Sequence, residues 1–170
     1  MLQNTLYTKT ITTPVGKLRL VASGKGLCAV LFRDGEGSRL TFDGAVEAGD
    51  THPILQKTER QLQEYFAGKR QTFDVALDMR GTVFQLMAWK ELQNIPYGAT
   101  RSYAEQARGV GDVKKARAVG MANGRNPVAI IVPCHRVIGA NGALTGFGGG
   151  LPVKEFLLEH ERVCLMKKAG

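Results

Sequence analysis

The sequence has little cysteine and no long apolar run, and both absences limit what the chain can be. Its 170 residues include three cysteines, Cys28, Cys134 and Cys164. Their odd number and wide spacing, without a Cys-x-x-Cys pair, argue against a disulfide framework or a common zinc module. No segment approaches the apolar length of a membrane span, and residues 1–13 lack the basic start and apolar core of a secretory signal. We therefore expect no membrane partner and a reducing location, the cytoplasm or, in a nucleated cell, the nucleus.

Acidic side chains are also scarce, and unevenly so. The formal net charge is +8. Residues 1–80 carry 11 basic and 9 acidic side chains, whereas residues 81–170 carry 12 basic and 6 acidic ones. The second half is therefore the electropositive half, which favours a polyanionic partner there.

The first half of the sequence has the pattern of a small sheet followed by a helix. Short β-rich runs are separated by glycine-containing turns and predict three antiparallel strands over 6–12, 17–22 and 27–32. The weak periodicity of residues 33–50 predicts a loop. Apolar spacing predicts an amphipathic helix over 52–66 that ends before Gly68, followed by a charged connector over 69–80.

The second half is mainly helical in pattern. We expect helices from Thr82 to a stop at Pro96, over 102–108, over 113–122 after a turn and an N-cap at Asp112, and from Pro152 through Glu161. Two short helices joined by a glycine-containing turn predict a helix-turn-helix unit. The fold class is therefore α+β: an N-terminal domain over 1–80 with an antiparallel sheet plus helix and connector, then a mainly helical C-terminal domain over 81–170.

A candidate nucleophile follows the apolar run 128–132, which predicts a buried strand. Pro133 closes that run and Cys134 comes next. The adjacent His135 and Arg136 are expected to lower the pKa of the thiol. Since neighbouring residues of an extended segment point to opposite sides, we expect a water molecule to bridge the thiol and the imidazole. A buried structural cysteine and the nucleophile of a cysteine hydrolase are the alternatives.

Glu161 continues the stripe of Val153 and Leu157 on the last predicted helix, so its carboxylate is expected to face the core. A buried carboxylate needs a cationic or hydrogen-bonding partner, and His135 is the candidate. The alternative is a solvated carboxylate at the end of the helix.

The helix over 113–122 carries Lys114 and Arg117 on one face, with Val113, Ala116 and Val119 on the other. Its many small residues would let the backbone approach a surface closely. This pattern fits docking on DNA, and an ordinary solvated helix face is the alternative.

Several ordered motifs resemble the O6-alkylguanine-DNA alkyltransferase family (methylated-DNA–protein-cysteine methyltransferases) and span residues from about 81 to 161. They are Gly81-Thr82-Val83-Phe84-Gln85 with Trp89, Ile95-Pro96-Tyr97-Gly98, Ser102-Tyr103, Arg117-Ala118-Val119-Gly120, Asn126-Pro127, Pro133-Cys134-His135-Arg136-Val137, Thr145-Gly146-Phe147, and Lys154 with Leu157-Leu158 and Glu161.

The resemblance implies single-use transfer of an alkyl group from guanine O6 to Cys134, without a cofactor. The implied partner is double-stranded DNA that contains O6-alkylguanine. We expect a monomer, with cooperative binding to DNA and activity on O4-alkylthymine left open. Non-catalytic sensors of alkylated DNA are similar to this family, but they lack the cysteine.

The resemblance also assigns roles. His135 acts as a base through a water molecule, Glu161 orients it, and Asn126 holds the turn before the nucleophile. The expected substrate-binding residues are Tyr103, Val137 (through its carbonyl, with that of Cys134), Phe147, Gly148 and Lys154. The expected DNA-binding residues are Arg117, which would fill the gap left by an extruded base, with Lys114, Lys115, Ala116 and Arg125.

Two departures from the family pattern concern the loop over 146–150, which we expect to form the lid of the purine pocket, and metal binding. Phe147 stands where many members have tyrosine. Some members hold zinc in the N-terminal domain, but here only Cys28 and His52 are available, so we expect no metal site.

Overall fold

The computed structural model describes residues 5–38, 40–42 and 44–169. The chain divides into two compact units, Met1–Arg80 and Gly81–Gly170, and each is described by itself. Within the described ranges, no helix is both long and apolar enough to cross a membrane. The expectations on residues 1–13 and 33–50 include residues 1–4, 39 and 43, which lie outside the described part.

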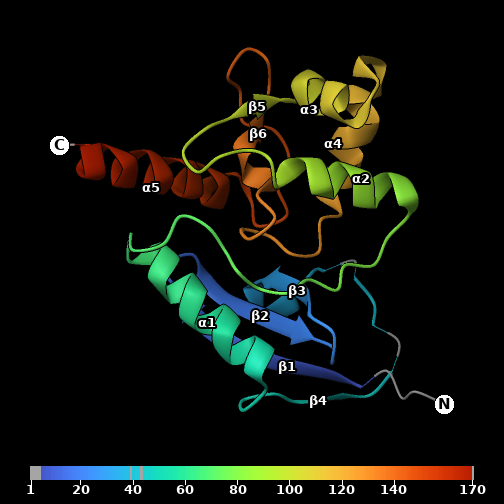
Figure 1. The fold of residues 1–170 in the computed structure, drawn as a ribbon, viewed down its shortest axis with the longest axis vertical. Coiled ribbons are helices and arrows are strands. Elements are labelled where there is room, and N and C mark those ends of the chain that lie inside the picture. Colours follow the sequence, from blue (N-terminus) through green and yellow to red (C-terminus); the bar gives the residue numbers. More distant parts are fainter. Residues whose placement is uncertain (1–4, 39, 43, 170) are drawn as a thin grey trace. The chain divides into compact units, whose positions relative to one another are not determined.

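The first unit is built on a four-stranded sheet in the order β3-β2-β1-β4 (Figure 1). Strands β1 (Leu6–Thr13), β2 (Gly16–Ala22) and β3 (Leu27–Phe32) are antiparallel neighbours, so this part of the predicted fold is confirmed. Gly16 has a φ of +96° at the β1–β2 turn, a conformation that glycine adopts without steric cost.

The predicted loop over 33–50 was wrong in part, because β4 (Val46–Ala48) lies parallel to β1. A short 3-10 helix, η1 (Arg33–Gly35), also begins this segment. All three residues of β4 are exposed, so the strand has no apolar alternation by which the sequence could reveal it. Backbone hydrogen bonds hold its ends, from Leu6 N to the Ala45 carbonyl and from Gly49 N to the Thr8 carbonyl.

Helix α1 (Pro53–Phe66) packs against β1, β2 and β3 (Figure 1). Its Leu55, Leu62 and Tyr65 side chains are buried. The connector after it is part of the unit, since Leu27 exchanges backbone hydrogen bonds with Ala76 and Asp78. A Cβ on Gly26 would lie 2.8 Å from the Ala76 carbonyl oxygen, which explains the glycine at that position.

The second unit contains helices α2 (Val83–Leu92), α3 (Tyr103–Val110), α4 (Ala116–Gly124) and α5 (Leu151–Ala169). Short strands β5 (Arg101–Ser102) and β6 (Val137–Ile138) pair in parallel. The N-terminal ends of α2 and α3 each carry a capping box, formed by Thr82 with Gln85 and by Ser102 with Glu105, which satisfies backbone donors that a helix start leaves unpaired. Trp89 of α2 is buried and donates from Nε1 to the Ala122 carbonyl of α4 at 2.8 Å, so α2 supports the predicted helix-turn-helix.

All four expected helices of this unit differ somewhat from their predicted bounds: α2 ends at Leu92, short of the predicted stop at Pro96, and α3 extends to Val110, beyond residue 108. The helix expected over 113–122 is divided into the 3-10 helix η2 (Val113–Lys115) and α4. Val113 is consequently 46% exposed and does not belong to the apolar face. The last helix begins at Leu151, one residue before the predicted start at Pro152, and continues to Ala169, beyond Glu161.

The apolar run 128–132 is not a strand, and that expectation was wrong. Val128 makes one isolated bridge, residues 129–131 form a turn, and Ile130 has a φ of +72°. The run is nevertheless buried apart from the half-buried Ile131. An apolar run indicates that a segment is buried but does not determine its conformation, because a compact buried turn needs apolar side chains as much as a strand does.

Candidate functional site

Cys134 opens a single-turn 3-10 helix, η3 (Cys134–Arg136), directly after the buried turn. Its backbone N–H donates to the Val132 carbonyl at 2.9 Å, and the residue is 9% exposed. Burial raises the pKa of the Cys134 thiol above its ordinary value, while the Asn126 side chain and the positive charge of Lys154 act to lower it. The expectation that His135 and Arg136 lower this pKa was wrong, because both side chains pair with Glu161.

Asn126 closes the turn that positions the thiol. Its Nδ2 donates to the Val132 carbonyl at 2.8 Å, and its Oδ1 accepts from the Val128 N–H at 3.0 Å. One side chain therefore bonds both ends of the run 128–132. Because Ile130 holds a φ that β-branched residues disfavour, these two bonds help to stabilise an otherwise costly backbone conformation.

His135 and Glu161 form a buried pair, as the periodicity of the last helix predicts. His135 Nε2 lies 2.8 Å from Glu161 Oε1, and both side chains are completely buried. Burial lowers the pKa of His135, although its bond to Glu161 acts in the opposite direction. The imidazole is therefore neutral at neutral pH, and a neutral ring that donates from Nε2 to the carboxylate keeps a lone pair on Nδ1. Nδ1 is buried and has no hydrogen-bond partner in the described part of the chain.

Glu161 also receives an ion pair that the sequence analysis did not assign. Arg136 donates from Nε to Oε2 and from Nη2 to Oε1, both at 2.9 Å, and from Nη1 to the Ile95 carbonyl at 2.7 Å. The Gly98 N–H donates to Oε2 at 3.1 Å. Burial alone would raise the pKa of Glu161, but the hydrogen bond from His135 and the ion pair with Arg136 outweigh it and bring the pKa to about 2.

This pairing carried a signal in the sequence. An arginine directly after His135 at the end of an apolar run must itself be buried or nearly so, and a buried guanidinium requires an anion. Glu161 was already expected to face the core, so the two charges could have been matched.

Lys154 of α5 is 1% exposed, and its side chain contacts the residues that follow the nucleophile Cys134. Its Nζ donates to the Val137 carbonyl at 2.6 Å and to the Thr145 carbonyl at 2.9 Å. Burial lowers the pKa of Lys154, and the Cys134 thiol acts electrostatically to raise it. The structure thus brings Lys154 and Val137 together with Cys134, and adds Thr145, which the sequence analysis did not assign as a site residue.

Tyr103 lies at the start of α3, and its hydroxyl is 2.8 Å from Thr145 Oγ1. Phe147 and Gly148 lie two and three residues further along the same loop, where the Gly150 N–H donates to the Phe147 carbonyl. A Cβ on Gly148 would meet no atom within 4 Å, so internal packing does not require a glycine there.

The expected DNA-binding residues gather on η2, α4 and the residue after α4. Lys114, Lys115, Arg117 and Arg125 are exposed and Ala116 is half-buried. Lys115 Nζ lies 5.5 Å from the centre of the Phe84 ring of α2. On the opposite side of α4, Val119 is buried, so Arg117 of this helix faces solvent.

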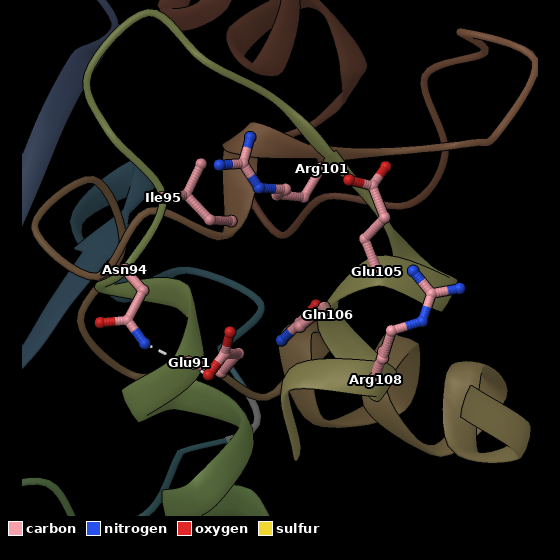
Figure 2. Close-up of a pocket in the computed structure, with 7 residues that line it drawn as sticks. All are labelled: Glu91, Asn94, Ile95, Arg101, Glu105, Gln106 and Arg108. Atoms are coloured by element: carbon pink, nitrogen blue, oxygen red, sulfur yellow. Dashed lines mark hydrogen bonds between the residues drawn. The ribbon is translucent and has the colours of Figure 1, made fainter. Parts of the chain in front are cut away.

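A separate cavity of about 270 Å³ lies between the end of α2, β5 and α3 (Figure 2). It is lined by Glu91, Asn94, Ile95, Arg101, Glu105, Gln106 and Arg108. None of the expected site residues lines it. Within the described ranges, no group of three or more His, Cys, Asp or Glu side chains is arranged to hold a metal ion.

Two family models together match most of the chain. The model described as "6-O-methylguanine DNA methyltransferase, DNA binding domain" matches residues 83–163. The model described as "6-O-methylguanine DNA methyltransferase, ribonuclease-like domain" matches residues 6–79.

Similar proteins and structures cover most of the chain, including both units. The methylated-DNA–protein-cysteine methyltransferase of Methanosarcina acetivorans is 47% identical over 159 residues, which are 94% of this chain and 100% of that protein. The protein of the same name from Mycobacterium tuberculosis strain H37Rv is 48% identical over 166 residues, with 92% of this chain and 93% of that protein covered. The crystal structure of Mycobacterium tuberculosis OGT in complex with DNA matches with a TM-score of 0.83 at 46% identity and covers 94% of each chain.

Proposed function

The chain belongs to the 6-O-methylguanine DNA methyltransferase family, and on that premise we propose that it repairs DNA by transferring an alkyl group from guanine O6 to Cys134. The Cys134 sulfur attacks the alkyl carbon, a C–S bond forms, and the C–O bond breaks with its electron pair left on the guanine oxygen. The guanine takes up a proton and is restored. The thioether has no good leaving group at neutral pH, so each molecule acts once.

His135 removes the thiol proton through a water molecule. Its Nε2 is held by Glu161, so Nδ1 is the nitrogen that can accept a proton. The imidazolium that forms is stabilised by the carboxylate, on the general logic of a base oriented by a third group. Because burial raises the pKa of the thiol, the sulfur is protonated at rest and needs this base.

Lys154 supports the same step electrostatically. Its charge lowers the pKa of the thiol and stabilises the thiolate at the moment it forms. The observation that carries the proposal is this combination: a buried thiol next to a buried His–Glu pair and a buried lysine.

The purine is bound in a pocket formed by Tyr103, Val137, Phe147, Gly148 and the Cys134 carbonyl. The Cys134 carbonyl accepts one hydrogen bond from the Val137 N–H, and the Val137 carbonyl accepts one from Lys154. Since a carbonyl oxygen has two lone pairs, each can accept a second bond, from the exocyclic amine of guanine.

DNA docks on α4, where small residues allow close approach in the minor groove. Lys114, Lys115 and Arg125 neutralise phosphates beside Ala116, and Arg117 fills the gap left by the extruded nucleotide. Chemistry on a paired base requires this extrusion, at a cost of roughly a few kcal/mol. We expect the protein to act as a monomer.

Intact mass spectrometry tests the proposal. After incubation with excess duplex that contains O6-methylguanine, the protein should gain the mass of one CH₂ unit, mapped to Cys134, and repair should stop at one equivalent. Cys134→Ser should bind the same duplex and gain no mass, because a neutral hydroxyl is a far poorer nucleophile than a thiolate. If the protein with Cys134 in place bound the duplex without any mass gain, a non-catalytic sensor would be favoured. Modification of Cys28 or Cys164 instead would contradict the assignment of Cys134 as the nucleophile.

A further inference from the structure

Thr145 joins three parts of the site through two different atoms. Its side-chain Oγ1 lies 2.8 Å from the Tyr103 hydroxyl, and its backbone carbonyl accepts from Lys154 Nζ at 2.9 Å. Lys154 donates at the same time to the Val137 carbonyl at 2.6 Å. A hydrogen-bonded path therefore runs from the start of α3, through Thr145 and the buried lysine of α5, to the segment that carries Cys134.

The Tyr103 ring is also held from a second side. A Cβ added to Gly120 would lie 3.5 Å from Cδ1 and Cε1 of Tyr103, so the ring packs against the backbone of α4 there. Packing on α4 fixes where the ring lies, but it does not choose the direction of the hydroxyl proton. That direction depends on the hydrogen-bond partner of the oxygen.

The two hydroxyls share one hydrogen bond, and the donor can be either oxygen. If Tyr103 donates, its only proton is used within the protein. If Thr145 donates, the Tyr103 oxygen is the acceptor and its proton is free for a ligand. A phenol that accepts a hydrogen bond is also a stronger donor, because hydrogen bonds in a chain polarise one another.

We propose that Thr145 is a positioning residue, which donates to the Tyr103 oxygen and thereby directs the Tyr103 proton to the extruded purine. The inference rests on the proposed function and adds Thr145 to it. Lys154 makes the arrangement precise, since it holds the Thr145 backbone by an ammonium group that is itself buried. The loop thus supplies a fixed donor rather than a mobile one.

The test compares Thr145→Val, which keeps the shape and removes the hydroxyl, with Thr145→Ser, which keeps the hydroxyl. The rate of mass gain on duplex O6-methylguanine should fall roughly threefold to tenfold in Thr145→Val, the range expected for one neutral hydrogen bond. Thr145→Ser should retain the rate of the unmodified protein. Thr100→Val changes another exposed threonine of this unit and should also leave the rate unchanged.

Tyr103→Phe supplies the readout that a purely structural role would not give. If Thr145 acts through the Tyr103 hydroxyl, Thr145→Val should slow the Tyr103→Phe variant no further, so that the two losses do not multiply. Independent, multiplying losses, or an unchanged rate in Thr145→Val, would overturn the inference. Thr145→Ala also removes the hydroxyl. If it lowered the melting temperature as Thr145→Val does but kept the full rate, the inference would be overturned as well. Failure of the proposed function is distinct, since the unmodified protein would then gain no mass at all.

Discussion

The ammonium group of Lys154 is buried, which is rare for a lysine. Its two carbonyl acceptors satisfy the ammonium group, and its charge acts on the neighbouring thiol. Replacement by methionine, which fits a buried aliphatic stem, should therefore raise the pKa of the Cys134 thiol further. The pH dependence of Cys134 alkylation by iodoacetamide, followed by peptide mass, measures that shift. Lys167→Met on the exposed end of the same helix is the control, and an equal profile in both variants would exclude an electrostatic role for Lys154.

Glu161 accepts hydrogen bonds from His135, Arg136 and the Gly98 backbone. Glu161→Gln replaces one acceptor oxygen by an amide that cannot accept, and leaves a buried guanidinium without its counter-ion. Breaking such a pair by removing one partner costs roughly 3–5 kcal/mol of the free energy of unfolding, which urea denaturation measures. The alkyl-transfer rate should fall as well, because His135 loses the group that stabilises its protonated form.

The matched control for this change is Glu159→Gln on the same helix. Glu159 pairs with Arg162 on the surface, where both side chains are more than half exposed. Exposed ion pairs contribute little to stability because water and salt screen them, so this variant should retain both stability and rate. A folded Glu161→Gln variant with an unchanged rate–pH profile would remove Glu161 from the mechanism.

At the scale of elements, η2 and α4 together present the exposed cations. If Arg117 fills the gap left by the extruded base, Arg117→Ala should slow repair of duplex DNA far more than reaction with free O6-benzylguanine, which needs no extrusion. Lys114→Ala should act differently: it should reduce the slope of log affinity against log salt by about 1, as the loss of one phosphate contact does. The slope of the unmodified protein should be roughly −3 if about three phosphates are neutralised. Equal losses on both substrates in Arg117→Ala would contradict its role in extrusion.

The elements also divide into those that local sequence determines and those that it does not. Strands β1 to β3 and helix α1 were predicted because apolar spacing and turn residues agree at those positions. Strand β4 was missed because its exposed residues have no apolar pattern and its pairing with β1 depends on a distant segment. The run 128–132 was given the wrong conformation because its turn is closed by Asn126, through bonds that no periodicity encodes.

At the scale of the whole molecule, stability should depend on acid through the buried pair. Burial lowers the pKa of His135 below its ordinary 6.5, so the unfolded chain binds a proton more readily than the folded one. The contribution of the neutral His135 to the free energy of unfolding is complete above pH 6.5 and is lost as the pH falls below that value. Glu161, with a pKa of about 2 in place of 4.5, adds a second loss as the pH falls from 4.5 towards 2.

Urea unfolding midpoints over a pH series measure these two losses. His135→Gln should abolish the decline that begins at pH 6.5 and keep the decline that begins at 4.5. A midpoint that stays constant from neutral pH down to 4.5 in the unmodified protein would contradict the neutral, buried state of His135.

The residues of the candidate site could be predicted from the sequence better than the hydrogen bonds and ion pairs between them. Cys134, the inward carboxylate of Glu161 and its pairing with His135 followed from motif and helical spacing. The bonds of Arg136 to Glu161 and of Lys154 to the Thr145 carbonyl join elements that are distant in the sequence, and they depend on how those elements pack. The effect of Lys154 on the thiol, in place of the expected effect of Arg136, follows from the same packing.

The carboxylate of Glu161 has a consequence for how this sequence can change. Loss of Glu161 alone leaves the buried Arg136 guanidinium without its counter-ion, and loss of Arg136 alone leaves the charge of Glu161 with two neutral donors, His135 and the Gly98 N–H. A well-packed apolar group can replace a whole buried ion pair at little cost, but every single step towards that replacement passes through a less stable protein. In a library selected for folding and not for repair, positions 136 and 161 should therefore change together or remain as they are, so that the chemistry of the site is preserved by the stability of the fold.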